Sequence, residues 1–186
     1  MSTGTLRLKK LQHTNGTDVA TLDSAGAMNL STIKSSTSNT AMTIDTAGRV
    51  LTPSRPAFSV LNTSSVTISG LTALVFDTAT FNIGNHFELS TGKFTAPVTG
   101  IYLFCFKTML YNMGTGEYLD FYPYINGVQK QRFELTGNGG GHTQFDYNEL
   151  VQLNANDEFR LYGTDRTTGS YAMYTNENRF TGCLIG

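Results

Sequence analysis

The chain has 186 residues, a formal net charge of −1 at pH 7 and only 15% charged residues. This balance argues against a nucleic-acid-binding protein, because phosphate backbones are held chiefly by clustered Lys and Arg. No stretch approaches the roughly 18 apolar residues of a membrane-spanning helix, and no apolar segment follows the basic residues near the N-terminus. We therefore expect neither membrane insertion nor a secretion signal.

The first 54 residues contain no aromatic side chain, whereas all 12 Phe and all 9 Tyr follow them. A segment without large side chains cannot bury enough apolar area to offset the entropy lost when it becomes ordered. We therefore divide the chain into an N-terminal stalk or attachment segment, 1–54, and a folded head, 55–186.

The N-terminal segment contains an internal repeat. Residues 11–30 align with residues 33–52 at an offset of 22, and both copies place an Asp-x-Ala-Gly turn between short alternating runs. In such a turn Asp accepts backbone hydrogen bonds and Gly adopts a positive φ. Repeats of this kind bury their faces against neighbouring repeats or other chains, so the pattern favours an ordered, extended interchain β stalk. A disordered Ser/Thr-rich tail is the alternative.

From residue 55 onward the pattern is that of an all-β domain. Leu119, Phe121 and Pro123 alternate with Asp120, Tyr122 and Tyr124. The Asn126-Gly127 pair that follows is a strong hairpin signal. Because Pro123 cannot donate to a sheet ladder, it predicts an edge strand or a bulge. Many short strands separated by turn clusters, without helical periodicity, predict a sandwich or a barrel.

One run of the head, FTAPVTGIYLFCF at residues 94–106, is apolar on both sides of its expected strand. Side chains alternate along a strand, so Tyr102 and Phe104 point to one face while Leu103 and Cys105 point to the other. A second apolar face requires a cover, which is either another sheet or another subunit. The run is therefore architectural rather than catalytic.

The spacing of aromatic, asparagine and glycine positions resembles the signature of the complement C1q globular domain over residues 55–186. The resemblance continues through the turn at 125–127 and the closing run FTGCLI at 180–185. It implies a ten-stranded jelly-roll sandwich of the C1q and tumour-necrosis-factor type, assembled as a homotrimer. The positions that carry it, and that would form the core and trimer scaffold, are Phe76, Asn82, Phe87, Phe94, Gly100, Tyr102, Phe104, Phe106, Phe180 and Gly182.

Two departures from that family guide the functional prediction. We expect no secretion signal, and the sequence shows no Gly-X-Y collagen period; instead, AMTIDTAGRVLT at residues 41–52 resembles stretches of bacteriophage tail-fibre proteins. We therefore predict a non-enzymatic trimeric virion structural protein, a phage tail fibre or spike assembled in the host cytoplasm. Its N-terminal segment would bind other virion proteins, and its head would bind a glycan or protein on the host surface.

Two alternatives to the tail-fibre prediction remain open. One is a capsid decoration or head-fibre protein that stabilises the shell, with adhesion as a secondary role. The other is a cellular C1q-like carbohydrate-binding protein, against which the expected lack of a signal peptide argues.

The sequence shows no catalytic or metal-binding constellation. His13, His86 and His142 are widely separated, and no His/Cys cluster has metal-ligand spacing. The glycines at 137–141 lack the Lys-Ser/Thr that follows a phosphate-binding loop. Some C1q-like heads bind calcium, but nothing in the sequence supports convergent oxygen ligands. We predict no enzyme activity, no metal and no cofactor.

The two cysteines, Cys105 and Cys183, both lie within apolar strand-like runs. This location favours buried free thiols, since a free cysteine behaves as a small hydrophobic residue. A disulfide between them remains open, because pairing depends on geometry.

Three long loops, 108–117, 136–143 and 164–178, are expected at one end of the head if the strands run antiparallel. The tight turns and the C-terminus fall at the other end. Binding residues gather on loops held by a rigid scaffold, and Tyr with Asn, Asp or Arg suits recognition of sugars or proteins. The candidate receptor-binding residues are Tyr111, Asn112, Asn138, His142, Asp165, Arg166 and Tyr171.

Overall fold

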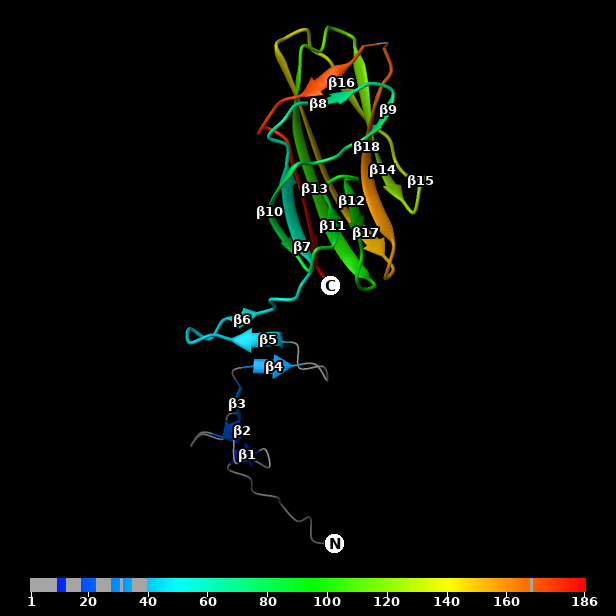
Figure 1. Cartoon of the computed structure of the whole chain (residues 1–186). Helices are drawn as coiled ribbons and strands as arrows, with labels where there is room; N and C mark the ends of the chain where they lie inside the picture. Colours follow the sequence, from blue (N-terminus) through cyan, green and yellow to red (C-terminus); the bar gives the residue numbers. More distant parts are fainter. Residues whose placement is uncertain (1–9, 13–17, 23–27, 31, 35–39, 168) are drawn as a thin grey trace. The chain divides into compact units, whose positions relative to one another are not determined.

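A computed structural model describes residues 10–12, 18–22, 28–30, 32–34, 40–167 and 169–186. The chain divides into two compact units, an N-terminal unit, Met1–Ser54, and the head, Arg55–Gly186. Every regular element in the described residues is a β-strand (Figure 1). Among them there is no helix of the length and hydropathy that a membrane crossing requires.

The N-terminal unit consists of two three-stranded antiparallel sheets, each in sequential order. The first contains β1 (Lys10–Gln12), β2 (Asp18–Leu22) and β3 (Met28–Asn29), and the second contains β4 (Thr32–Lys34), β5 (Thr40–Ile44) and β6 (Val50–Leu51). Every strand boundary of the second sheet lies 22 residues after its counterpart in the first. The sequence repeat is therefore also a structural repeat.

The turn between β5 and β6 follows the chemistry expected of Asp-x-Ala-Gly. The Oδ1 atom of Asp45 accepts hydrogen bonds from the backbone N–H groups of Ala47 and Arg49, both at 2.9 Å. Gly48 adopts a φ of 78°, a conformation that glycine tolerates and most residues avoid. The corresponding turn of the first repeat lies outside the described residues.

The head is a sandwich of two seven-stranded sheets. Sheet I has the order β10-β7-β20-β13-β19-β8, with β17 paired to the other edge of β13. Its strands are β7 (Ala57–Leu61), β8 (Val66–Ile68), β10 (Thr78–Ile83), β13 (Gly100–Tyr111), β17 (His142–Leu153), β19 (Tyr171–Met173) and β20 (Arg179–Leu184).

Sheet II has the order β11-β12-β18-β14-β15, and β9 and β16 pair with β18 and β14. Its strands are β9 (Leu71–Ala73), β11 (Phe87–Glu88), β12 (Lys93–Thr95), β14 (Tyr118–Ile125), β15 (Val128–Gln129), β16 (Phe133–Thr136) and β18 (Glu158–Asp165). The resemblance implied ten strands, and the described head has more because several, such as β9 and β15, are pieces of two or three residues.

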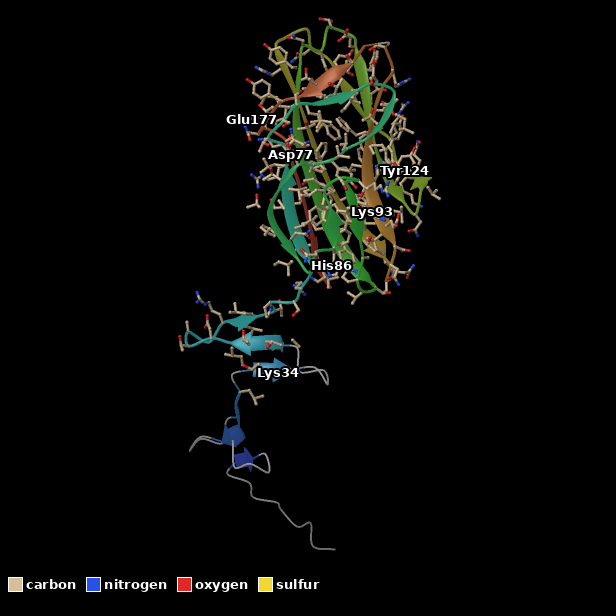
Figure 2. The ribbon with its side chains drawn as sticks, viewed as in Figure 1. Lys34, Asp77, His86, Lys93, Tyr124 and Glu177 are labelled. Carbon is tan, nitrogen blue, oxygen red and sulfur yellow. The ribbon has the colours of Figure 1, made fainter. Side chains whose placement is uncertain are left out.

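Aromatic side chains fill the space between the two sheets (Figure 2). Phe104 of sheet I stacks on Phe159 of sheet II, with ring centroids 4.0 Å apart and planes inclined by 9°. The other aromatic positions of the C1q-like spacing are also buried: Phe76, Phe87, Phe94, Tyr102, Phe106 and Phe180. Burying such rings supplies most of the driving force for forming the sandwich.

The non-aromatic positions of that spacing have geometric roles. The side-chain amide of Asn82 donates to the carbonyl of Phe87 at 2.8 Å and accepts from its N–H at 3.2 Å, which fixes the turn between β10 and β11. A Cβ atom on Gly182 would lie 2.4 Å from the Phe58 ring, and one on Gly100 would lie 2.8 Å from the carbonyl oxygen of Gly186. Glycine permits close packing at both places.

Pro123 does not lie on an edge strand, because β14 has partners on both sides. On one side, however, β16 pairs with residues 118–121 and β15 with residues 124–125, so the ladder is interrupted beside Pro123. There Pro123 only accepts, from the N–H of Lys130 at 2.9 Å. The missing donor therefore faces the interruption, which is why proline is tolerated.

Candidate functional site

Three connections of the head meet at one end, the long-loop end, whose described residues are 112–117, 137–141, 166–167 and 169–170. The N–H of Asn112 donates to the carbonyl of Gly141 at 3.1 Å, and the N–H of Gly137 donates to Glu117 at 2.8 Å. The N–H of Arg166 donates to Tyr118 at 3.3 Å. The C-terminus lies at the opposite end of the head (Figure 1).

The opposite end, with its tight turns, is also where the head begins. Arg55 donates from its guanidinium to the carbonyl of Ile185 at 2.9 Å, and the N–H of Ile101 donates to Gly186. Asn126 of the hairpin turn and Asp157 of the next turn are joined by a 2.8 Å hydrogen bond. The first and last residues of the head therefore both lie at the end away from the long loops.

Three aromatic rings gather at the long-loop end and form the aromatic cluster: Tyr111, His142 and Tyr174. Tyr111 and His142 are directly opposite residues of β13 and β17, and Tyr174 is placed beside them by its N–H bond to Met109 at 2.8 Å. The two tyrosine rings stack at 5.9 Å, and the His142 ring meets them edge-on at 5.2 and 5.4 Å. All three side chains are exposed.

An open hollow of about 340 Å³ lies against the cluster and is lined by Ser65, Tyr111, Ala172, Met173, Tyr174 and Thr175. An exposed pair of stacked rings beside such a hollow is a flat apolar contact surface with hydroxyl groups at its rim. Sequence reasoning missed Tyr174, which directly follows the short strand β19. The signal would have been the pairing of Met173 with Leu110 of β13, which places Tyr174 opposite Met109 and its ring against that of Tyr111; only the fold reveals this pairing.

Two predicted residues shape the loops beside the cluster. Asn112 adopts a φ of 57°, a left-handed conformation that asparagine tolerates better than most residues. The Oδ1 atom of Asn138 accepts from the N–H of Gly140 at 2.9 Å. Both side chains are exposed.

Two other predicted residues lie away from the cluster: Asp165 ends β18 of sheet II, and Arg166 contacts side chains of that sheet. Arg166 contacts the carboxylates of Asp120 at 3.5 Å and Glu134 at 2.9 Å. Asp120 is fully buried, so Arg166 offsets part of the cost of burying its charge. Asp165 accepts from the N–H and hydroxyl groups of Thr167. Both residues therefore have structural partners already.

Tyr171 must be removed from the predicted contact residues, because its side chain is only 4% exposed. It begins β19 and packs in the core, and its hydroxyl lies 3.0 Å from the hydroxyl of Thr167. Burial raises the pKa of this phenol above its ordinary value. A buried ring offers no contact area to a receptor.

The face of sheet I that is turned away from the core, the outer face, is apolar near the tight-turn end. Leu103 lies directly opposite Leu150 on β17 and Cys183 on β20, so these three side chains share that face. The large exposed apolar side chains around them are Phe81, Ile83, Ile101, Leu150 and Ile185. A patch of this kind marks an interaction surface on a soluble protein.

Both cysteines lie on the outer face and are free. They are partly exposed, so the prediction of buried thiols was wrong about their location. Cys105 is opposite Thr181, and Cys183 is opposite Leu103, so the two cysteines are diagonal neighbours on adjacent strands. Diagonal neighbours are typically about 7–8 Å apart, farther than a disulfide allows.

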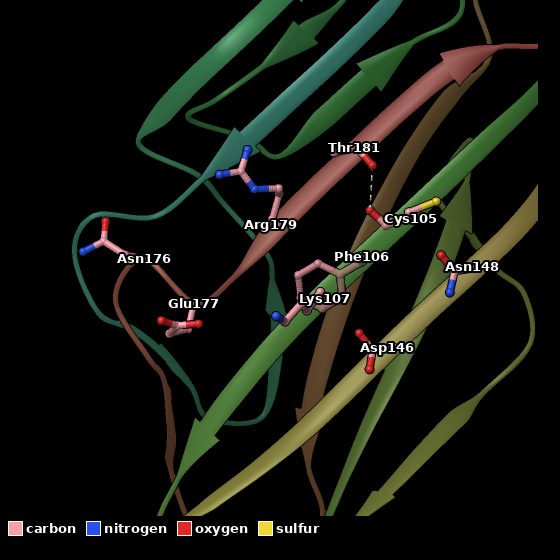
Figure 3. Close-up of a pocket in the computed structure, with 9 residues that line it drawn as sticks. All are labelled: Cys105, Phe106, Lys107, Asp146, Asn148, Asn176, Glu177, Arg179 and Thr181. Carbon is pink, nitrogen blue, oxygen red and sulfur yellow. Dashed lines mark hydrogen bonds between the residues drawn. The ribbon is translucent and has the colours of Figure 1, made fainter.

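Midway along the outer face lies a second hollow, of about 330 Å³, shown in Figure 3. Lys107, Asp146 and Arg179 cross it as directly opposite residues of three adjacent strands. Arg179 donates to the hydroxyl of Ser59 at 2.9 Å. The hollow separates the apolar patch from the aromatic cluster with a charged band.

No arrangement in the described residues suggests metal chemistry, since no three His, Cys, Asp or Glu side chains converge there. His13 lies outside the described residues. Burial lowers the pKa of His86 below its ordinary value, and His142 belongs to the aromatic cluster. The glycines at 137–141 connect β16 with β17, both strands, so no helix N-terminus follows to hold a phosphate.

Comparison with known proteins identifies relatives of the head. Residues 57–185 match the family model described as the C1q domain. The chain is 30% identical over 133 residues to mouse complement C1q tumor necrosis factor-related protein 2, a match that covers 70% of this chain and 43% of that protein. It is 29% identical over 136 residues to rat complement C1q tumor necrosis factor-related protein 5, covering 72% and 54%.

The fold also matches a solved structure. The globular domain of zebrafish complement 1qA protein superposes with a TM-score of 0.56 at 21% identity, covering 71% of this chain and 98% of that one. The chain spans about half the length of the curated relatives it matches. None of the relatives named here is a phage protein.

Proposed function

This chain belongs to the C1q domain family, and on that premise we propose that it is a homotrimeric binding protein whose long-loop end recognises a surface glycan. The family is non-enzymatic. C1q domains typically form trimers, and a trimer of this chain would display three copies of the long-loop end. Threefold display turns weak single contacts into useful avidity.

The outer face of sheet I supports the trimer. It carries exposed Leu150, Ile101 and Phe81 around half-buried Leu103. Removing apolar area from water stabilises an assembly by about 25 cal/mol per Å² before the costs of association. Association around a threefold axis covers the same patch on every copy, as expected for a closed, symmetric homo-oligomer.

The aromatic cluster is the single observation that carries the proposed glycan recognition. The stacked rings of Tyr111 and Tyr174 are exposed in the head and offer a rigid surface to the apolar face of a sugar ring. Asn112 and the tyrosine hydroxyls supply directional hydrogen bonds. Tyrosine combines contact area with low entropy cost, which suits this kind of recognition.

The cellular C1q-like carbohydrate-binding protein thus replaces the tail fibre as the leading proposal, because the named relatives are complement C1q and its tumor necrosis factor-related proteins. A virion role, as a tail fibre or a head fibre attached through residues 1–54, is the second candidate. The observation that favours it is the 22-residue β repeat, which replaces a collagen period.

Glycan binding by the full-length protein tests the proposal. On a glycan array, Tyr111→Ala and Tyr174→Ala should each weaken binding at least tenfold, because each removes half of the stacked pair. Tyr118→Ala is the matched control, since Tyr118 is an exposed tyrosine at the same end but outside the cluster. Binding that survives both cluster substitutions would contradict the assignment.

The mass in solution tests the assembly separately. The chain has a mass of 20.3 kDa, so light scattering should report about three times this value for a trimer. A monomer at micromolar concentration would contradict the trimer.

A further inference from the structure

Four apolar side chains of the second sheet of the N-terminal unit share one face, and this set is here called the apolar wall. Ile33 of β4 lies directly opposite Met42 of β5, and Ile44 of β5 lies opposite Val50 of β6. Met42 and Ile44 are two residues apart on one strand, so all four side chains share one side of the sheet. No charged residue belongs to this set.

The opposite face of the same sheet is mostly polar. Thr43 lies opposite Thr32 on one side and Leu51 on the other. The sheet is therefore amphipathic, and the apolar wall is the face expected to pack against another surface. Such alternation is typical of an antiparallel sheet that is packed on one face and exposed to solvent on the other.

In the single chain the apolar wall remains uncovered. Ile33, Ile44 and Val50 are 44%, 37% and 58% exposed. A sheet with strands of two to five residues is not stable alone in water unless its apolar face packs on something. The strands are therefore expected to be ordered only where another surface covers the wall.

The first sheet repeats this design. Its strands have the same lengths and the same 22-residue offset, and its ladder is irregular at Leu11/Gln12 just as the second is at Ile33/Lys34. The positions equivalent to the apolar wall are Leu11, Ala20, Leu22 and Met28, paired as Leu11 with Ala20 and Leu22 with Met28. All four are apolar residues, so the sequence pattern of the apolar wall recurs in the first repeat.

We propose that these two sheets are walls of a triangular β prism formed by three copies of this chain, with the apolar walls facing its axis. The proposal rests on the homotrimer proposed for the head, which would bring three N-terminal units together at high local concentration. The same surface on each copy then covers the other two, and both repeats are covered in register.

The dimensions of such a prism agree with sheet packing. Three strands spaced by about 4.8 Å make a wall about 14 Å wide, and the axis of a triangular prism of that width lies about 4 Å from each wall. Sheets packed face to face are about 10 Å apart, so side chains need about 5 Å on each side. Side chains of the size of Ile, Val and Met therefore fill the interior without a channel.

The composition of the wall favours copies of the chain over a different protein. Each wall has four apolar positions, and it recurs after 22 residues, so a foreign partner would need a matching surface with the same period. An axis about 4 Å from each wall leaves room for aliphatic side chains, and residues 1–54 contain no aromatic residue. A narrow interior filled by aliphatic side chains of three chains would account both for the lack of aromatic residues and for the apolar alternation.

Hydrogen exchange of the full-length trimer tests the prism. Amides of β5 and β6 should exchange slowly, and Ile44→Asp should speed their exchange at least tenfold by placing a charge at the axis. Thr43→Asp is the matched control, because it changes the next residue of the same strand on the opposite face; its exchange should stay within twofold. Ile44→Val should also keep the protection, since the wall remains apolar.

The possible outcomes separate this proposal from the proposed head trimer. A trimeric mass with slow exchange that Ile44→Asp alone abolishes supports the prism. A trimeric mass with unprotected β5 and β6 overturns the prism and leaves the head trimer intact. Equal loss in the Ile44→Asp and Thr43→Asp variants overturns the assignment of the faces, and a monomer with unprotected strands overturns both proposals.

Discussion

The head and the N-terminal unit are built from the same element, the amphipathic antiparallel strand, but they differ in where the covering layer comes from. In the head, two sheets of one chain bury Phe104, Phe159 and their neighbours between them. In the N-terminal unit, the described single-layer sheet leaves Ile33, Ile44 and Val50 exposed. Strand alternation therefore specifies an apolar face in both regions, while only the head supplies its own cover.

The outer face of sheet I lies between these two cases. It belongs to a self-sufficient sandwich, yet it presents Leu150 and Ile101 to solvent. We infer that the head can fold before it assembles, whereas the N-terminal unit needs assembly in order to fold. Three substitutions examine this difference, in order of decreasing effect.

Phe104→Ala should have the largest effect, because it removes a fully buried ring stacked on Phe159. A truncation of this kind typically costs about 3–5 kcal/mol through lost burial and a residual cavity. Urea unfolding followed by tyrosine fluorescence would measure it. Met42→Ala in the N-terminal unit should leave the head transition unchanged, and a comparable shift from both variants would refute the contrast.

Leu150→Asp should weaken the trimer without unfolding the head. Leu150 is 62% exposed on the outer face of sheet I, so a charge there costs little in the monomer but is desolvated in the assembly. We expect at least tenfold weaker association, about 1.4 kcal/mol, measured by analytical ultracentrifugation. Exchange of β5 should become fast at the same time, while β13 stays protected.

Val128→Asp is the control for Leu150→Asp. Val128 has a similar exposure, 57%, but lies on β15 of sheet II. Its substitution should leave both the trimer mass and the exchange of β5 unchanged. A trimer that Leu150→Asp does not weaken would place the interface on another face.

Asp77→Asn should have the smallest effect, and it is confined to the head. The Asp77 carboxylate accepts the N–H groups of Thr63 and Ser64 at 2.9–3.0 Å and the hydroxyl of Thr78. These bonds, chiefly that from the Thr63 N–H, lower the pKa of Asp77 from 3.8 to about 2, although burial acts in the opposite direction. Losing the carboxylate at pH 7 should cost on the order of 1 kcal/mol.

The pH dependence of this effect has a defined sign. Because the folded pKa lies below the unfolded one, the contribution is fully present above about pH 4 and is lost as the pH falls toward 2. The difference in urea midpoint between wild type and Asp77→Asn should shrink over that window. Glu88→Gln, an exposed carboxylate with one side-chain partner, should show a smaller difference at pH 7.

The part of the fold that depends on local spacing could be predicted. Alternation around Tyr102 and Phe104 predicted a strand with two apolar faces, and sheet II covers one of them. The offset of 22 between residues 11–30 and 33–52 predicted repeated β units, and the strand boundaries repeat at that interval. Both predictions needed only the period of the side chains, which the backbone geometry of a strand imposes.

The composition of the candidate site was harder to predict, because loop membership does not determine side-chain direction. Tyr171 and Tyr174 are three residues apart in one predicted loop, yet Tyr171 is buried and Tyr174 is exposed in the aromatic cluster. Their difference follows from β19, whose pairing with β8 and β13 turns Tyr171 toward the core. Nothing in the adjacent residues specifies that pairing.

Composition and strand periodicity were enough to predict that this protein is made of strands, that its aromatic residues form a head, and that its N-terminal region repeats. These properties follow from composition and from the two-residue period of a strand, which act over a few neighbouring residues. The folded head, in contrast, was needed to show which apolar face is covered, which tyrosines are exposed, and that Arg166 pairs with buried Asp120. Those outcomes depend on contacts between strands far apart in the chain, because burial is a property of what lies across a sheet and not of what lies next in sequence.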